Sequence, residues 1–141
     1  NSSAASDVYK RQYQLRAILE GAAARLCAAP ETDISELEEI YQDSCKILEN
    51  KDFSRYTDIN REFHNEIWTA AGNGKMKNMI SELWNGLSMG NMVSEEDYAK
   101  VSVKEHGEIL EAIKAHDGDA AEAAMKEHIM RSRDDMLTYY N

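Results

Sequence analysis

The sequence predicts an all-α fold, an antiparallel bundle of about six helices, and three observations support this class. Apolar residues recur with the helical period from Tyr13 almost to the C-terminus. The single proline and several of the glycines fall between the periodic stretches. No stretch shows the alternation of apolar and polar residues that is typical of a strand. Because the connections are short, successive helices are expected to run antiparallel.

The first two helices are bounded by residues that stop or start a helix. The first begins at Tyr13 and ends at Pro30, which cannot continue a helix because it lacks the backbone N–H. The second begins at Asp33, with Glu36 three residues later in the arrangement of a capping box, and runs to about Asn50.

The third and fourth helices meet at a glycine-rich turn. The third begins near Asp52 and ends at residues 72–74, Gly-Asn-Gly, where glycine and asparagine tolerate the left-handed conformation of a C-cap. The fourth is expected over roughly residues 75–92, where Gly86 and Gly90 weaken its later turns. That weakness leaves room for a ligand.

The last two helices are separated by Asp-Gly at residues 117–118. The fifth is expected over about residues 94–116. The sixth opens with Asp119 and Glu122 as a second cap pair and continues towards the C-terminus.

Length and composition indicate one domain. The chain has 141 residues, of which 43% are hydrophobic, enough for one core and too few for two ordinary domains. Its 26 acidic and 16 basic residues give a formal net charge of -10, which repels the phosphate backbone of a nucleic acid. The two cysteines, Cys27 and Cys45, show no C-x-x-C spacing, and no apolar run is long enough to span a membrane. These observations predict a cytoplasmic domain that contacts no membrane and does not bind DNA by itself.

Residues 1–12, NSSAASDVYKRQ, differ from the rest of the chain. They are polar, begin without methionine and precede an abrupt change to the periodic pattern. The segment resembles translated adapter DNA, and the alternative is an ordinary disordered tail. We therefore divide the chain into a non-native or disordered tail, residues 1–12, and one folded domain, residues 13–141.

Three of the four histidines, His64, His106 and His128, lie on the apolar stripes of three different predicted helices. Imidazole nitrogen is a common ligand of divalent transition metals, so convergence of the three inside a bundle predicts a metal site. Asn60 lies one turn before His64 and points to the same face of the helix. An isolated core histidine usually only bonds to a neighbour, so a metal-free core is the alternative. His116 falls in the last turn of its helix and is expected at the surface.

Several motifs occur in the order and spacing of a known family. They are L-R-A-I-L-E-G at residues 15–21, N-R-E-F-H at residues 60–64, A-A-G-N at residues 70–73, and E-H followed by I-L-E-A-I within residues 105–113. His128 follows His106 by 22 residues, where the family has its last histidine. From Leu15 to about Leu137 the chain resembles the FCD ligand-binding domain of FadR-type GntR transcription regulators.

The resemblance implies a metal held by one oxygen and three imidazoles, with Asn60, His64, His106 and His128 as its ligands. The family commonly has aspartate at the position of Asn60. Because an amide oxygen brings no charge, we expect weaker metal retention and a more positive centre. Zinc is the expected metal because it suits imidazole ligands, although nickel, manganese or iron would accept a similar site.

Open positions on such an ion are where a small molecule binds, and a carboxylate or hydroxy acid supplies hard oxygens of opposite charge. Arg16 on the first helix is expected to be a second anchor of this effector, because its planar guanidinium matches a carboxylate. The alternative for Arg16 is a surface ion pair with Glu20, four residues further on.

The resemblance further implies a homodimeric sensor domain that controls DNA binding through an N-terminal winged helix, a domain absent from this chain. The chain is therefore predicted to be a regulatory domain and not an enzyme. A metal-dependent hydrolase would need a general base near the metal, yet Glu105 and Glu127 directly precede histidines and so point elsewhere around their helices. A structural dimerisation bundle without metal is the other alternative.

Overall fold

The structure, a computed structural model, describes residues 2–84 and 94–138. The helices are α1 (Ser2–Cys27), α2 (Ser35–Glu49), α3 (Tyr56–Ala70), α4 (Gly74–Leu83), α5 (Glu95–Lys114) and α6 (Gly118–Thr138), with a 3-10 turn at Phe53–Arg55. No strand occurs in the described ranges, so the predicted all-α class is confirmed. None of these helices is both long enough and apolar enough to cross a membrane.

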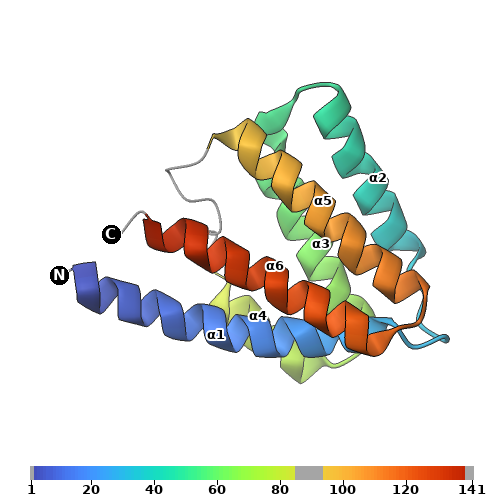
Figure 1. Cartoon of the computed structure of the whole chain (residues 1–141). Helices are drawn as coiled ribbons and strands as arrows, with labels where there is room; N and C mark the ends of the chain where they lie inside the picture. The colour runs from blue at the N-terminus through green and yellow to red at the C-terminus, as the bar shows by residue number, and fades with distance from the viewer. Residues whose placement is uncertain (1, 85–93, 139–141) are drawn as a thin grey trace.

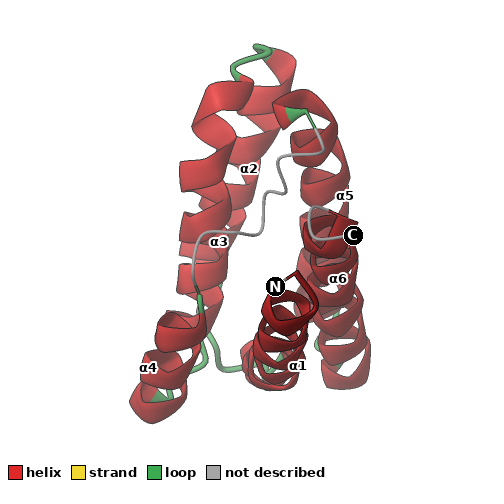
Figure 2. Ribbon diagram, turned by 90° about the vertical axis from the view of Figure 1, so that its left-hand side faces the viewer, coloured by secondary structure: helices red, strands yellow, loops and turns green. Residues whose placement is uncertain are grey.

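The helices form a bundle in which α1 and α6 lie side by side and run in opposite directions (Figure 1). The start of α1 and the end of α6 therefore lie at the same end of the molecule. Helix α6 also packs against α5, α2 packs against α3 and α5, and α4 contacts α1 and α3 (Figure 2). All six described helices therefore contribute buried apolar side chains to the core.

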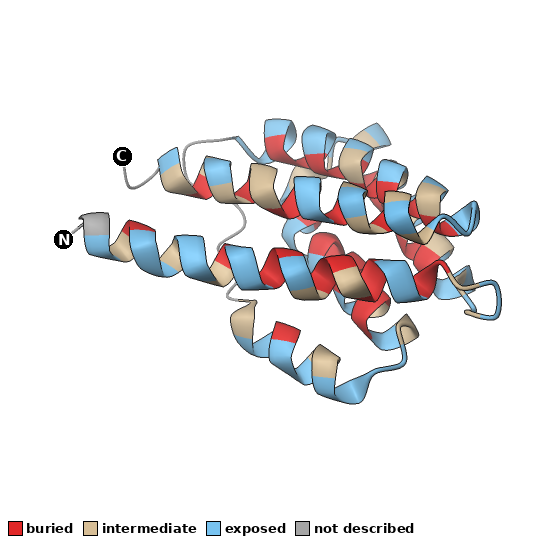
Figure 3. Cartoon of the chain, turned by 60° about the horizontal axis from the view of Figure 1, so that its bottom comes forward, coloured by how far each residue is buried: buried red, intermediate tan, exposed pale blue. Residues whose placement is uncertain are grey.

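The core follows the predicted apolar stripes, and the buried residues of the helices face one another (Figure 3). Large side chains with almost no exposed surface include Phe63 and Ile67 of α3, Ile109 and Ile113 of α5, and Met125 and Ile129 of α6. Close packing of such side chains supplies most of the stability of a bundle, because burying each one removes apolar surface from water. It also fixes how the helices that carry the histidines are rotated.

Two helix starts are capped differently from the prediction. Before α2, Asp33 accepts hydrogen bonds from the backbone N–H and the hydroxyl of the serine two residues later, and no capping box forms. Before α6, Asp117 accepts the backbone N–H of the residue three positions later, at 3.0 Å. Asp119 and Glu122 pair instead with Arg25 of α1. Tertiary charge pairing has overridden the local capping signal of these two carboxylates.

Two boundaries also differ from the prediction. Helix α1 begins at Ser2, so residues 2–12 are helical and the disordered alternative for this segment is wrong in the structure. The reason is that Ser6, Tyr9 and Tyr13 continue the inward face of α1 and pack against the bundle. The non-native origin of residues 1–12 stays a prediction. Helix α4 ends at Leu83, and the expected weak turns at residues 86–92 lie outside the described residues.

Candidate metal centre

The three predicted histidines meet in the middle of the bundle. His64 comes from α3, His106 from α5 and His128 from α6, and their exposed fractions are 1%, 1% and 2%. Each histidine has one ring nitrogen that could bind a metal, and these three nitrogens all lie within 4.8 Å of one another. Within the described part of the chain, these three histidines form a cluster whose nitrogen atoms are close enough together to bind one metal ion.

The Nδ1 atom of each of the three histidines lies beside an oxygen that can accept a hydrogen bond. Nδ1 of His64 lies 2.6 Å from Glu20 Oε1, and Nδ1 of His128 lies 2.7 Å from Glu105 Oε1. Nδ1 of His106 lies 3.4 Å from the hydroxyl of Tyr56, which donates its own proton to a serine at 2.6 Å. An ionised carboxylate and a hydroxyl whose proton is engaged only accept, so each Nδ1 carries the hydrogen. In neutral rings, all three Nε2 atoms then present lone pairs.

The spacing of the lone pairs matches a metal site. Nε2 of His64 and Nε2 of His128 are 3.2 Å apart. Two lone pairs at this distance repel unless a proton or a metal ion lies between them. Zinc–nitrogen bonds of about 2.0–2.1 Å in a tetrahedral arrangement place two nitrogens roughly 3.3 Å apart. The observed distance agrees with two ligands of one ion.

Buried atoms without partners point to the same chemistry. Among the described residues, the buried side-chain atoms without a hydrogen-bond partner include His106 Nε2 and Asn60 Oδ1. The amide nitrogen of Asn60 donates a hydrogen bond to the hydroxyl of Tyr98 at 3.4 Å. The amide oxygen is therefore the polar atom of this side chain that has no partner. Leaving a buried polar atom unsatisfied costs about 1–3 kcal/mol. A divalent metal would give His106 Nε2 the partner that it lacks, so the three imidazoles fit such an ion, and Asn60 Oδ1 is a further buried oxygen without a partner.

Burial favours the neutral form of two of the three rings. Burial lowers the pKa of His106 well below its ordinary value and lowers the pKa of His128 to about 4. Burial alone would raise the pKa of Glu20, but His64 and Arg16 outweigh it and bring the pKa to about 2. Neutral imidazole is the form that binds metal, and an ionised carboxylate on Nδ1 raises its basicity.

Arg16 lies inside the bundle, so the alternative of an ion pair with Glu20 at the surface is wrong about its location. Its Nε donates to Glu20 Oε2 at 3.0 Å, and the pair is almost fully buried. The guanidinium carbon lies 4.5 Å from the centroid of the Trp84 ring and 5.0 Å from that of Tyr13. The predicted i, i+4 pair is present, and through Glu20 it connects Arg16 to His64. The effector contact of Arg16 stays a prediction.

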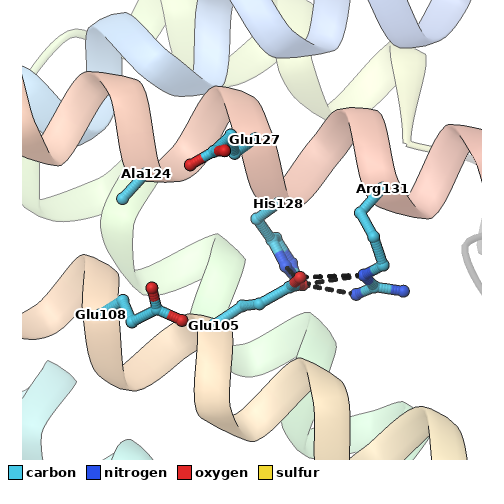
Figure 4. A pocket seen from close by; sticks show the side chains of 6 residues that line it. All are labelled: Glu105, Glu108, Ala124, Glu127, His128 and Arg131. Carbon is cyan, nitrogen blue, oxygen red and sulfur yellow. Dashed lines mark hydrogen bonds and ion pairs between the residues drawn. The ribbon is translucent and has the colours of Figure 1, made fainter.

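Glu105 has a partner that the sequence analysis missed. It points away from the neighbouring His106, as expected, but it reaches across to His128 and Arg131 of α6 (Figure 4). Arg131 Nη2 donates to Glu105 Oε1 at 2.6 Å, and Arg131 Nε lies 3.0 Å from both carboxylate oxygens. Because both oxygens are engaged, Glu105 is poorly placed to act as a general base. The i, i+3 spacing of His128 and Arg131 was the available signal, since it places both on one face of α6.

A cavity of about 250 Å³ lies beside this pair, between α5 and α6 (Figure 4). It is lined by Glu105, Glu108, Ala124, Glu127, His128 and Arg131. Three of the six lining residues are glutamates, and one of them, Glu105, is paired with Arg131.

His116 takes no part in the cluster. It is exposed, as predicted, and Nδ1 lies 3.0 Å from the carbonyl oxygen of Ala28. It follows the end of α5 with a φ of 58°, and its N–H and the next N–H close the helix on Ile113 and Ala112. This is the hydrogen-bond pattern of a Schellman C-cap, with histidine where glycine is usual.

Comparison with known proteins places the chain in a family. The model of the FCD domain matches residues 12–131. Among solved structures, "Streptococcus agalactiae GntR" superposes with a TM-score of 0.72 at 26% sequence identity. The match covers 92% of this chain and 60% of that chain, so the chain spans less than two thirds of its relative. No protein of curated function matches the sequence.

Proposed function

Because the chain belongs to the FCD domain family, we propose that it is the metal-dependent effector-sensing domain of a bacterial GntR-type transcription regulator. The observation that carries the metal dependence is the convergence of three buried Nε2 atoms, each on a ring whose Nδ1 is held by an acceptor. A core histidine that serves packing alone does not need two other imidazoles facing its lone pair. A metal-free dimerisation bundle leaves this arrangement unexplained.

The proposed ligands are His64, His106, His128 and Asn60. Glu20 and Glu105 would orient two of the rings, and the Tyr56 hydroxyl would orient the third. When bound, a zinc ion or a related divalent metal supplies open coordination positions for oxygen atoms of a ligand. Asn60 would contribute its oxygen without charge, so the site is expected to hold metal less tightly than one with aspartate.

The charge balance favours an anionic effector, a small carboxylate or hydroxy acid. The two glutamates that bond to histidine rings are already paired, Glu20 with Arg16 at 3.0 Å and Glu105 with Arg131 at 2.6 Å. Neutral imidazoles and an amide would leave the charge of a divalent metal uncompensated by its ligands. A carboxylate bound to the metal would reduce that charge, and Arg16 would be its second contact.

The partner proposed for the domain is a second copy of itself, with DNA bound through a winged-helix domain outside this chain. Leu15, Ile18 and Leu26 of α1 are 42–52% exposed. Glu20 is the only acidic residue between Tyr13 and Cys27, and it is buried. This face of α1 is therefore apolar and free of exposed carboxylates, which favours self-association of a chain with a net charge of -10.

Metal analysis and thermal melting test this function. Protein purified without chelator is expected to contain about one divalent ion per chain, and zinc added to metal-free protein is expected to raise the melting temperature. Small carboxylates screened in the presence of zinc should raise it further, and their recovery unchanged would support binding over turnover. Equal melting with and without metal would favour the metal-free bundle.

A further inference from the structure

Glu20 is a carboxylate side chain with no exposed surface, and three donors hold it in place. Its Oε1 accepts from His64 Nδ1 at 2.6 Å and from Trp68 Nε1 at 3.0 Å. Its Oε2 accepts from Arg16 Nε at 3.0 Å. One carboxylate on α1 therefore fixes two side chains of α3 and one of its own helix.

A second contact joins the same groups. The ring of Trp84 lies 4.9 Å from the His64 ring, centroid to centroid, and 4.5 Å from the guanidinium carbon of Arg16. Arg16 and His64 are thus held both through Glu20 and through one indole. A buried carboxylate is tolerated only when donors compensate for the lost water, so rotation of any one of these side chains disturbs the others.

We propose that Glu20 is a positioning residue that sets the orientation and basicity of His64, and that Arg16 tunes this effect by sharing the charge of Glu20. The inference rests on the proposed function, because it assigns His64 to the metal. Carboxylate partners of metal-bound histidines fix the tautomer and strengthen the nitrogen–metal bond. Arg16 withdraws negative charge from the carboxylate, so it opposes this strengthening. A carboxylate effector that engages Arg16 would release Glu20 towards His64, and metal and effector would each tighten the other.

The test is the affinity of the protein for zinc alone, measured by competition with a chromophoric chelator. Glu20→Gln leaves a neutral amide beside His64 and is expected to weaken zinc binding by about 10- to 100-fold. Arg16→Gln breaks the same ion pair from the other side and is expected to leave zinc affinity at or above the wild-type value. General structural damage would lower the affinity in both variants, so the opposite outcomes identify the positioning role.

The matched control is Glu111→Gln, the same change at an exposed glutamate of α5, which is expected to bind zinc like the wild type. Equal zinc affinity in Glu20→Gln and the wild type would overturn the inference and leave the proposed function intact. A wild-type protein that binds no zinc would overturn both. If Glu20→Gln does not fold, Arg16→Gln decides: affinity at or above wild type supports the inference, and a tenfold loss overturns it.

Discussion

Replacing His106 by alanine separates a metal ligand from a core histidine. The His106 ring is 1% exposed and stacks on Phe63 with 4.0 Å between centroids, so its loss creates a cavity in either case. By analogy with other large-to-small core substitutions, this packing loss costs about 2–4 kcal/mol of unfolding free energy, with or without metal. It therefore cancels when the stability of the variant is compared between the two conditions.

The metal-dependent difference is the informative quantity. At a free zinc concentration 100 times its Kd, the wild type gains about 2.7 kcal/mol, or roughly 10 °C in Tm for a domain of this size. Loss of a ligand is expected to exceed the roughly 10- to 100-fold effect of losing a partner of a ligand. If Kd rises by about 100-fold, the gain at the same zinc concentration falls to about 0.4 kcal/mol.

The assay is denaturant unfolding of the wild type, His106→Ala and His116→Ala, each in chelator and in buffered zinc. His116 is the matched control because it is exposed and its ring nitrogen Nδ1 lies beside the Ala28 carbonyl, outside the histidine cluster. It is expected to retain the full zinc-dependent gain. Full retention in His106→Ala, or an equal loss in both variants, would refute the ligand assignment.

Three further changes test the charge of the site, its ligand set and the proposed dimer. The pKa of His128 is about 4 in the folded protein, below its ordinary 6.5. Between these two pH values the unfolded chain therefore binds a proton at His128 that the folded chain does not bind. The unfolding free energy of metal-free protein should therefore fall by about 3 kcal/mol between pH 7 and pH 4 from this group alone, as measured by denaturant titration. Asn60→Asp adds a charged oxygen and is expected to raise zinc affinity by about tenfold or more in chelator competition. Ile18→Glu places a charge on the apolar face of α1 and is expected to convert a dimer to a monomer in analytical ultracentrifugation.

Each of these three predictions has an outcome that would contradict it. Constant stability of the metal-free protein from pH 7 to pH 4 would contradict the neutral, buried state of His128. Equal gains in zinc affinity for Asn60→Asp and for Asn65→Asp, at an exposed asparagine of α3, would exclude a direct bond from residue 60. For the dimer, Gln14→Glu adds the same charge to α1 beside the apolar face. An unchanged sedimentation coefficient in both α1 variants would reject this face.

The helix positions and the inward placement of three histidines were predictable because both are local properties. Helical periodicity fixes which face of a helix a residue occupies, and an apolar face is a buried face in a bundle. His64, His106 and His128 share faces with large apolar residues, so their burial followed from spacing. His116 was predicted to be exposed because it falls at the end of its helix, and it is exposed.

The environment of the histidines was not predictable by this route. Glu20 lies 44 positions before His64, and the two meet only because α1 packs against α3. Glu105 was expected to point away from the site because it directly precedes His106 on α5, and the spacing within one helix says nothing of the neighbouring helix. In the bundle, α6 supplies His128 and Arg131 on the side that Glu105 faces.

The sequence by itself determined the element types, the bundle class and the chemical identity of the candidate ligands, since these depend on composition and on spacing within single helices. Only the tertiary structure decided which nitrogen of each ring faces the centre, and that Arg16 is buried against Glu20. Those properties depend on contacts between helices and on desolvation, which act across the bundle and leave no mark on the local pattern.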